Sequence, residues 1–302
     1  MVLGSVHHSR GFHQTATADA FGATIAAGRL YGLTRDQMRV ALGLCSTRAS
    51  GLKSQFGTMG KPYNAGIAAA NRVECAGLAR AGFTSVDDGV MGPQGFVATH
   101  SAAPSEAGVR DDPPPGTFLF EDIKYKLHAC CHGTHAMIEA LAATKRGHNL
   151  TPERVAAIHL RTSRRWLSVC DIKAPRTGVE VRFSYNWLAG MVLSGISTSA
   201  DRSYTDALAA DPSLAAVAGK ITVTGDATVS DMQAAGAVGL IDGAVLPFAH
   251  DLAAHLDPDL LARSPRAKAT GLLGAEAEHL RQAVVNLDAL SATDLGKKLM
   301  AA

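Results

Sequence analysis

Two stretches of the chain concentrate titratable side chains within otherwise apolar sequence. The first, residues 57–66, reads GTMGKPYNAG and places Lys61 and Asn64 after a glycine-rich turn. Its glycines and lysine suggest a phosphate-binding loop, but Pro62 follows the lysine where that motif requires serine or threonine. A glycine-rich turn with a solvated lysine is the plainer interpretation. Pro62 also favours a helix start, which would hold the ammonium of Lys61 where an anion could bind.

The second stretch, residues 124–135, reads KYKLHACCHGTH and holds three histidines, two cysteines and two lysines. Zinc binding is one interpretation, but adjacent cysteines without a second C-x-x-C pair do not match the usual ligand spacing. The stretch could instead be a buried structural cluster, in which Cys130 and Cys131 pack as small apolar side chains. It could also be catalytic, because closely spaced lysine and histidine shift each other's pKa values towards neutrality. These alternatives stay open on the local sequence.

A further cationic group lies near the N-terminus, where His7, His8, Arg10 and His13 follow one another closely. The sequence has no G-x-S-x-G nucleophile elbow and no G-x-G-x-x-G motif. It also lacks a pair of carboxylates placed as in a glycosidase. Serine hydrolase, dinucleotide-binding and glycosidase chemistry are therefore disfavoured.

The composition narrows the class of protein. The chain has 302 residues, of which 47% are hydrophobic and 19% charged, and a net charge of +2. This balance excludes intrinsic disorder, and the absence of a basic stripe argues against nucleic-acid binding. The odd number of cysteines, five, indicates reduced thiols. We expect a cytoplasmic protein, because we find neither a signal peptide nor the roughly 18 consecutive apolar residues of a membrane span.

Periodicity and turn signals predict the elements that position these residues. A T-x-x-Q capping box at Thr34 and Gln37 predicts a helix that stops at Gly51. Three consecutive prolines within residues 110–117 predict a domain boundary. We expect further helices at residues 15–30, 65–82, 135–143, 185–193 and from about 251, and strands at 158–163 and 220–224.

These elements predict a mainly α protein with two domains. Residues 1–112 and 250–302 should form one large all-helical domain built from both ends of the chain. Residues 118–248 should form an inserted α+β lid domain. Small residues dominate positions 15–30, which allows close approach of the helices that should fill the first hundred residues.

The longer motifs resemble the MmgE/PrpD family of 2-methylcitrate dehydratases and cis-aconitate decarboxylases, which includes an iminodisuccinate epimerase. The resemblance covers nearly the whole chain in the right order and implies the same helical domain and inserted lid. It rests on RGFHQTATADAFGATIAAGRLYGL, FGTMGKPYNAGIAAANRVECAGLARAGFTS, GPQGF, KYKLHACCHGTHAMIEAL and RTGVEVRFSYNWLAGMVL.

The resemblance also assigns residues to an active site. His13 lies at the family's active-site histidine, Lys61 at the lysine of its K-P motif, and Lys126 at the lysine that opens the segment ending in T-H. These three are the expected catalytic residues, and their side chains should converge on one cleft between the domains. Asn64 stands where many members have histidine. The expected substrate-binding residues are Asn64, His128, Cys131 and His132.

The activity implied by the resemblance is proton transfer next to a carboxylate on a small di- or tricarboxylic acid. The chain would then be a lyase, either a 2-methylcitrate dehydratase or a cis-aconitate decarboxylase, or alternatively an epimerase of an iminodisuccinate-like dicarboxylate. Fixed cations in a water-poor cleft would stabilise the charge that develops. The resemblance implies no metal and no organic cofactor. Because the charge pattern disfavours nucleic acid and the hydropathy disfavours a membrane span, the expected partner is a small polycarboxylate substrate.

Family members carry an N-terminal helical segment before the motif of His13, whereas Met1 lies only twelve residues before this histidine. We therefore expect the chain to lack that segment, and a truncated non-catalytic fragment or pseudoenzyme is the alternative from another class. The missing helices should expose apolar faces at residues 20–30 and 40–44. Together with the family's dimeric habit, this predicts a homodimer.

Overall fold

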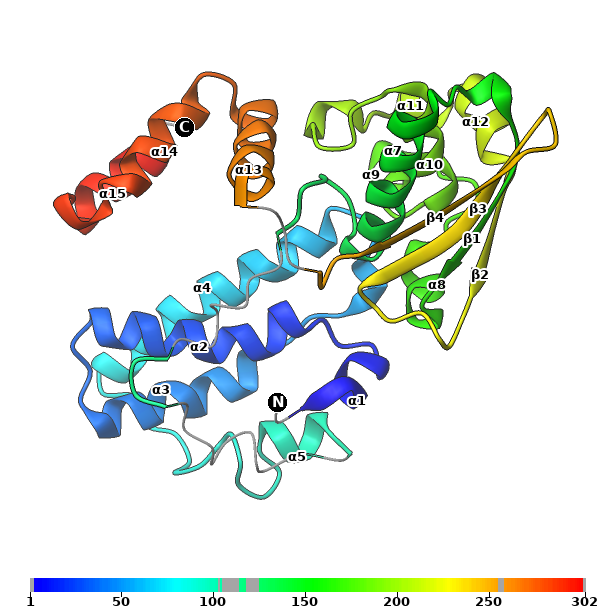
Figure 1. Cartoon of the computed structure of the whole chain (residues 1–302). Coiled ribbons are helices and arrows are strands. Elements are labelled where there is room, and N and C mark those ends of the chain that lie inside the picture. The colour runs from blue at the N-terminus through cyan, green and yellow to red at the C-terminus, as the bar shows by residue number, and fades with distance from the viewer. Residues whose placement is uncertain (1–2, 103, 105–113, 118–124, 255–257, 301–302) are drawn as a thin grey trace. The chain divides into compact units, whose positions relative to one another are not determined.

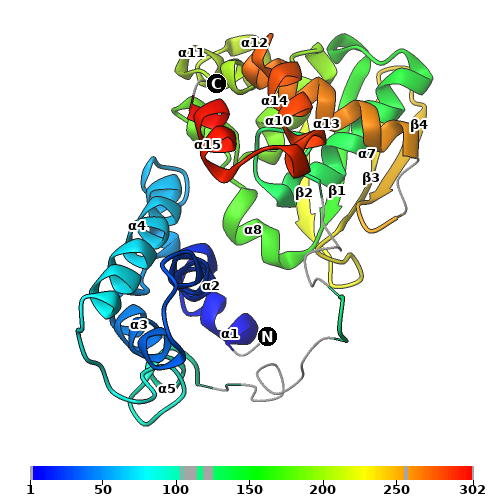
Figure 2. The same ribbon diagram turned by 90° about the vertical axis from the view of Figure 1, so that its left-hand side faces the viewer.

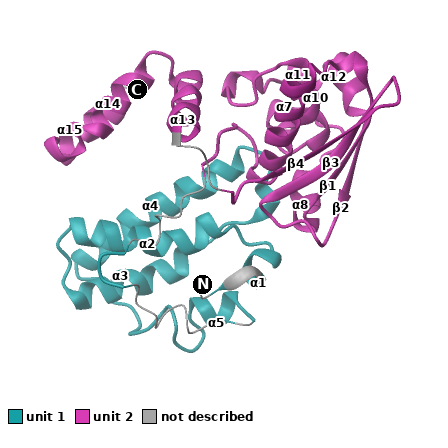
Figure 3. Ribbon diagram, in the orientation of Figure 1, with its two compact units in different colours: residues 1–121 teal, residues 122–302 magenta. Residues whose placement is uncertain are grey.

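Figure 1 shows a computed structural model of the chain, which describes residues 3–102, 104, 114–117, 125–254 and 258–300. The chain divides into two compact units, residues 1–121 and 122–302, coloured separately in Figure 3. Most described residues are helical, and the strands found among them all lie in the second unit. The mainly α character with an α+β region is thus confirmed.

The first unit is a small helical assembly. Helix α2 packs along both α3 and α4, and Figures 1 and 2 show the three side by side. The elements are α1 (Gly4–Ser9), α2 (Gln14–Leu30), α3 (Arg35–Arg48), the 3-10 turn η1 (Lys53–Gln55), α4 (Gly60–Arg80) and α5 (Phe96–His100).

Small side chains allow these helices to approach closely. Ala20 of α2, Cys45 of α3 and Ala68 of α4 are buried in one cluster, which Phe96 joins from α5. The capping box at the start of α3 is present, since Thr34 Oγ1 accepts from the Gln37 N–H and the Gln37 side chain accepts from the Thr34 N–H. Both expectations for this part of the chain are confirmed.

A four-stranded mixed sheet organises the second unit, with strand order β2-β1-β3-β4. Strands β1 and β2 are parallel, and β3 is antiparallel to both β1 and β4. The strands are β1 (Val155–Thr162), β2 (Ile221–Gly225), β3 (Gln233–Leu240) and β4 (Val245–Asp251).

Helices of the second unit cover one face of this sheet. Helix α7 packs on β3 and β4, and α10 packs between α7 and α12. The helices and 3-10 turns are η2 (His132–Thr134), α7 (His135–His148), η3 (Pro152–Arg154), α8 (Arg164–Cys170), α9 (Gly178–Val181), α10 (Tyr185–Ser194), η4 (Asp201–Ser203), α11 (Asp206–Ala209), α12 (Pro212–Ala218), α13 (Pro258–Leu273), α14 (Glu276–Val285), η5 (Leu287–Ala289) and α15 (Ala292–Met300).

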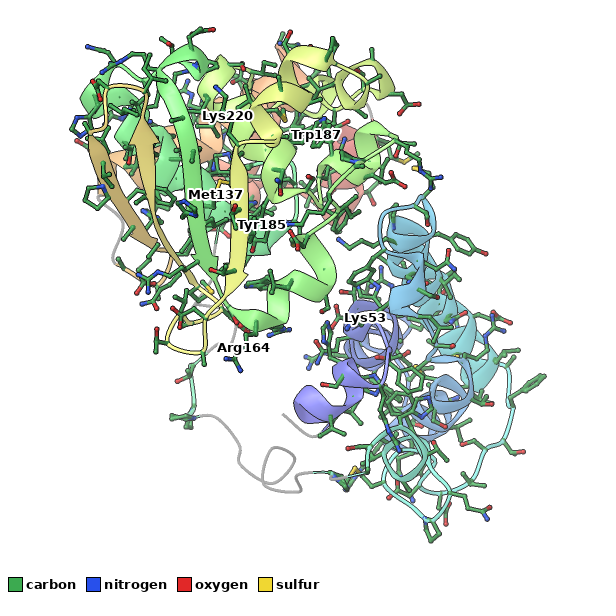
Figure 4. The ribbon with its side chains drawn as sticks, turned by 90° about the vertical axis from the view of Figure 1, so that its right-hand side faces the viewer. Lys53, Met137, Arg164, Tyr185, Trp187 and Lys220 are labelled. Atoms are coloured by element: carbon green, nitrogen blue, oxygen red, sulfur yellow. The ribbon has the colours of Figure 1, made fainter. Side chains whose placement is uncertain are left out.

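The core of the second unit lies between the sheet and the helices α7, α10 and α12. Met137 of α7 and Tyr185 of α10 are fully buried there and are labelled in Figure 4. The Tyr185 hydroxyl donates to the Gly133 carbonyl at 2.8 Å and lies 3.0 Å from Thr162 Oγ1. This hydroxyl therefore joins α10 to β1 and to the turn that precedes α7.

Replacing Tyr185 with phenylalanine is expected to lower the free energy of unfolding by about 1–3 kcal/mol, because the buried Gly133 carbonyl loses its donor. Both tryptophans, Trp166 and Trp187, belong to this unit, so their fluorescence during urea denaturation measures the change. The exposed Tyr125 offers the control, since Tyr125→Phe should shift stability by less than about 0.5 kcal/mol. Equal effects of the two substitutions would contradict the prediction.

Most expected elements are present, with two exceptions. Residues 15–30, 65–80, 135–143 and 185–193 are helical, so that the second helix ends two residues before the expected Gly82, and the two expected strands are β1 and β2. The predicted start of a helix at about residue 251 is wrong, because Asp251 ends strand β4 and α13 begins at Pro258. The helix expected to stop at Gly51 ends earlier, at Arg48.

The grouping of residues 1–112 with 250–302 in one domain stays a prediction, and Pro113 of the expected boundary lies outside the described residues. Among the helices that the structure describes, none combines the length and apolar character needed to cross a bilayer.

Candidate functional site

His13 is held at the start of α2 by its backbone. It is the N-cap residue of that helix, and its N–H donates to the Gly51 carbonyl at 2.9 Å. An isolated antiparallel bridge between Phe12 and Leu52 adjoins this bond. The loop before η1 therefore fixes the half-buried ring of His13 beside the first turn of α4.

Phe56 connects His13 with Lys61. The rings of Phe56 and His13 meet nearly perpendicularly, with centroids 5.0 Å apart. The ammonium of Lys61, in the first turn of α4, lies 5.4 Å from the centroid of the same Phe56 ring. A cation within about 6 Å of an aromatic face is attracted to it, so Phe56 helps to position the lysine near the histidine.

Asn64 completes this group from the next turn of α4. Its side chain is buried, and its Nδ2 donates to the Leu52 carbonyl at 3.1 Å. The same Nδ2 lies 3.3 Å from Nδ1 of His13. Gly51 leaves the space for this contact, because a Cβ there would lie 3.2 Å from Asn64 Oδ1.

The electrostatics of the group favour a neutral histidine beside a cation. Burial lowers the pKa of His13, and the nearby positive charge of Lys61 lowers this pKa further. The imidazole is therefore uncharged at neutral pH, while Lys61 supplies positive charge. This pairing suits the binding of an anionic ligand such as a carboxylate.

His128 of the second unit is held on both sides of its ring. Its Nε2 lies 3.0 Å from Glu139 Oε1 of α7, and its Nδ1 lies 2.8 Å from Thr198 Oγ1. The hydrogen bond from His128 lowers the pKa of the Glu139 carboxyl, although burial opposes this shift. Both ring nitrogens thus have protein partners.

The ring of His135 packs against the rings of two other histidines, His128 and His132. The His135 ring lies 4.9 Å from that of His128 and 5.3 Å from that of His132, centroid to centroid. Burial, followed by the positive charge of its neighbours, lowers the pKa of His135 to about 2. Burial and Lys126 also lower the pKa of His132. His135 therefore stays neutral at any physiological pH and cannot act as a general acid.

The adjacent cysteines have different environments. Cys130 is buried, its Sγ lies 3.2 Å from Thr134 Oγ1, and burial raises its pKa to about 11. It therefore remains a thiol and packs as an apolar side chain. Cys131 is half-buried, and its N–H donates to the Arg182 carbonyl at 3.0 Å. None of the five cysteines, all of them among the described residues, forms a disulfide.

Comparison with known proteins decides the family. The family model of the MmgE/PrpD N-terminal domain matches residues 2–107, and that of the MmgE/PrpD C-terminal domain matches residues 128–242. The chain belongs to the MmgE/PrpD family. The boundary between its two compact units falls in the interval between the two matches.

Curated relatives in this family come from two Aspergillus species. The chain is 32% identical over 167 residues to "Cis-aconitate decarboxylase-like protein oryM" of Aspergillus oryzae, a match that covers 52% of this chain and 33% of the relative. It is 33% identical over 153 residues to "Cis-aconitate decarboxylase" of Aspergillus terreus, covering 46% of this chain and 30% of that protein. The chain thus matches about a third of the length of these relatives.

The structure brings the residues expected from the MmgE/PrpD motifs together in two sets. His13, Lys61 and Asn64 form one group in the first unit. The remaining expected residues belong to the second unit and lie in the stretch that leads into α7. Convergence of the two sets on one cleft stays a prediction. The second set consists of Lys126, His128, Cys131 and His132.

Three supporting residues were not anticipated from the sequence. Glu139 is four residues beyond His135 on α7, so helical spacing could have placed it on the same face as the histidines. Phe56 and Thr198 gave no such signal. Among the residues described here, no group of three or more histidine, cysteine or acidic side chains could hold a metal ion.

Replacing Glu139 with glutamine is expected to lower the stability of the second unit by roughly 1 kcal/mol at neutral pH, because the charge assistance of the bond to His128 is lost. A carboxyl whose folded pKa is depressed stabilises above its unfolded pKa, and this contribution disappears as pH falls through the folded pKa. The deficit of the variant should therefore vanish in acid.

Urea denaturation followed by tryptophan fluorescence across acidic and neutral pH measures this difference. Glu276→Gln, at an exposed glutamate of the same unit, is the control and should leave the pH dependence of stability unchanged. A deficit for Glu139→Gln that is constant with pH would contradict the prediction.

Proposed function

We propose that the chain is a cofactor-independent carbon–carbon lyase that decarboxylates a small tricarboxylic acid of the cis-aconitate type. The observation that supports this most directly is the match to cis-aconitate decarboxylases at about 33% identity. The group of His13, Lys61 and Asn64 adds a chemical reason, because it pairs a cation with a neutral hydrogen-bonding imidazole.

In the proposed reaction the bond between carbon and one carboxylate breaks, and carbon dioxide leaves. The electron pair stays on the remaining organic acid and is delocalised towards a neighbouring carboxyl group, where negative charge develops. A proton then adds to carbon, so that one proton is consumed for each carbon dioxide released. Fixed positive charges and hydrogen-bond donors stabilise such charge best in a site that excludes water.

The roles follow from the charges of the side chains. Lys61 and Lys126 anchor the carboxylates, and one of these lysines or His13 handles the proton, a contribution of typically about 10²–10⁴-fold in rate. Asn64, Cys131 and His132 line the binding site in this proposal. His128, whose ring nitrogens already contact Glu139 and Thr198, contributes by holding this stretch in place.

The test is an assay of the purified chain with cis-aconitate, methylcitrate and iminodisuccinate, with carbon dioxide release and proton NMR of the products as readouts. We expect carbon dioxide and a dicarboxylic acid from cis-aconitate. Loss of water from methylcitrate, or epimerisation of iminodisuccinate, would instead identify the dehydratase or the epimerase. Absence of turnover with all three would support a non-catalytic chain. The homodimer likewise remains a proposal.

A further inference from the structure

The amide of Asn64 has only one orientation that suits its surroundings. The atom 3.1 Å from the Leu52 carbonyl must be the amino group, because an oxygen in that place would face another acceptor. Asn64 is 5% exposed, so water offers little compensation for a misplaced group. The Leu52 carbonyl therefore fixes which end of the Asn64 amide faces His13.

This orientation determines which nitrogen of His13 carries the proton. The amino group of Asn64 lies 3.3 Å from His13 Nδ1 and can only donate. The same group has two hydrogens, one for the Leu52 carbonyl and one for the ring. A proton on Nδ1 would place two donors against each other, so the neutral ring keeps its proton on Nε2.

We infer that Asn64 is a positioning residue that locks His13 in the Nε2–H tautomer, so that His13 serves the reaction as a hydrogen-bond donor and not as its base. The role in the reaction rests on the proposed function, whereas the tautomer rests on the contacts within the first unit. An imidazole that presents Nε2–H can donate to a carboxylate oxygen that gains negative charge. The proton of the reaction is then handled by a lysine, which narrows the choice left by the sequence to Lys61 or Lys126.

The chemical logic makes aspartate the informative substitution at position 64. Aspartate has nearly the same shape as asparagine, but its carboxylate only accepts hydrogen bonds. In mildly alkaline buffer, where the ring is neutral, it would draw the proton onto His13 Nδ1 and release Nε2 as an acceptor. Asn64→Asp thus reverses the proposed role of His13 with little change in side-chain volume.

The decisive measurement is the tautomer of His13 in the full chain. Ring nitrogens of histidine are labelled with ¹⁵N, and long-range proton–nitrogen correlation NMR in mildly alkaline buffer distinguishes a protonated Nε2 from a protonated Nδ1. The spectrum of His13→Gln identifies the His13 signals among those of the 12 histidines. We expect at least about a tenfold preference for Nε2–H in the unmodified chain, in keeping with one buried hydrogen bond.

Two variants provide the comparison. Asn64→Asp should move the proton of the neutral ring to Nδ1, and Asn64→Ala should give a mixture of both tautomers. Asn71→Asp is the matched control, because Asn71 lies two turns later on α4, is 4% exposed and bonds to Arg48. It should leave the His13 signals unchanged. A predominant Nδ1–H form in the unmodified chain, or no response to Asn64→Asp, would overturn the inference.

Activity on cis-aconitate separates this inference from the proposed function. Asn64→Asp should lower kcat by roughly 10²-fold with a smaller change in KM, as expected when a donor to the developing charge is removed. Asn71→Asp should retain kcat. The expected tautomer in a chain that turns over no tricarboxylate would support the positioning role of Asn64 and overturn the proposed function. Unchanged kcat in Asn64→Asp, with the tautomer reversed, would overturn the role of His13 as donor.

Discussion

Replacing Lys61 with methionine is expected to raise the pKa of His13 and to lower kcat/KM on cis-aconitate by roughly 10²–10³-fold, the cost of removing one preorganised charge from a site. The pKa rises because Lys61 is one of the two causes that lower it, and the other, burial, remains. Methionine keeps most of the length of the side chain but removes the ammonium that lies over the Phe56 ring. An NMR titration of His13 and steady-state kinetics measure the two effects separately.

Lys53→Met is the matched control for this prediction. Lys53, labelled in Figure 4, belongs to the same unit, but its ammonium donates to the His8 carbonyl at 3.2 Å and does not enter the causes that shift the pKa of His13. This control should change neither the pKa of His13 nor kcat/KM appreciably. An unchanged pKa in Lys61→Met would mean that the lysine and the histidine do not interact. Unchanged kinetics would remove Lys61 from the proposed reaction.

The sequence predicted those parts of the fold that depend on residues close to one another along the chain. The capping box of Thr34 and Gln37 needs only four consecutive residues, and the structure has both of its hydrogen bonds. The placement of Lys61 in the first turn of α4 followed from Pro62 in the same way. Such features are readable because their partners lie within one helical turn.

The sheet was only half predicted, and the reason is its composition. Strands β1 and β2 alternate branched apolar residues with polar ones, whereas β3 reads QAAGAVGL. Alanine and glycine have low strand propensity, so the pattern of β3 carries no strand signal of its own. This segment is a strand because it pairs with β1 on one side and with β4 on the other. One local hint was available, since Asp242 and Gly243 follow β3 as a turn pair typical of hairpins.

The contacts within the candidate site were predicted less completely than the sheet. Family motifs indicated His13, Lys61 and Asn64, but the contacts among them depend on the loop around Leu52, which no motif singled out. His128 is bound by Thr198, which is 70 residues further along the chain. A single sequence does not reveal such a pair, because its formation depends on the packing of α10 and of the loop that follows it.

Gly51 shows how a correct residue can be given the wrong role. The sequence suggested a helix stop, a role that usually requires a left-handed backbone. Helix α3 instead ends at Arg48, and Gly51 is not among the glycines with positive φ. The structure gives it another function, close approach between the loop, α2 and Asn64.

Replacing Gly51 with alanine is therefore expected to destabilise the first unit by about 1–3 kcal/mol, the usual cost of forcing a methyl group into a packed interior. The new Cβ would lie 2.2 Å from Ala16 Cβ, which is fixed to the first turn of α2 and cannot rotate away. The loop must move, and it carries the Gly51 carbonyl that holds His13 and the Leu52 carbonyl that orients Asn64. Thermal denaturation followed by circular dichroism measures the loss of stability. The NMR signals of His13 should also shift.

Gly77→Ala adds the same methyl group on α4, but it should raise stability instead of lowering it. Nothing lies within 4 Å of a Cβ at Gly77, and the residue is helical, so alanine should stabilise by roughly 0.5–1 kcal/mol through helix propensity alone. Both substitutions reduce the conformational freedom of the unfolded chain alike. The difference between their effects on the free energy of unfolding therefore isolates the contact with Ala16. If Gly51→Ala melted at or above the temperature of the unmodified chain with the signals of His13 unmoved, the loop would not be what holds His13 and Asn64 together.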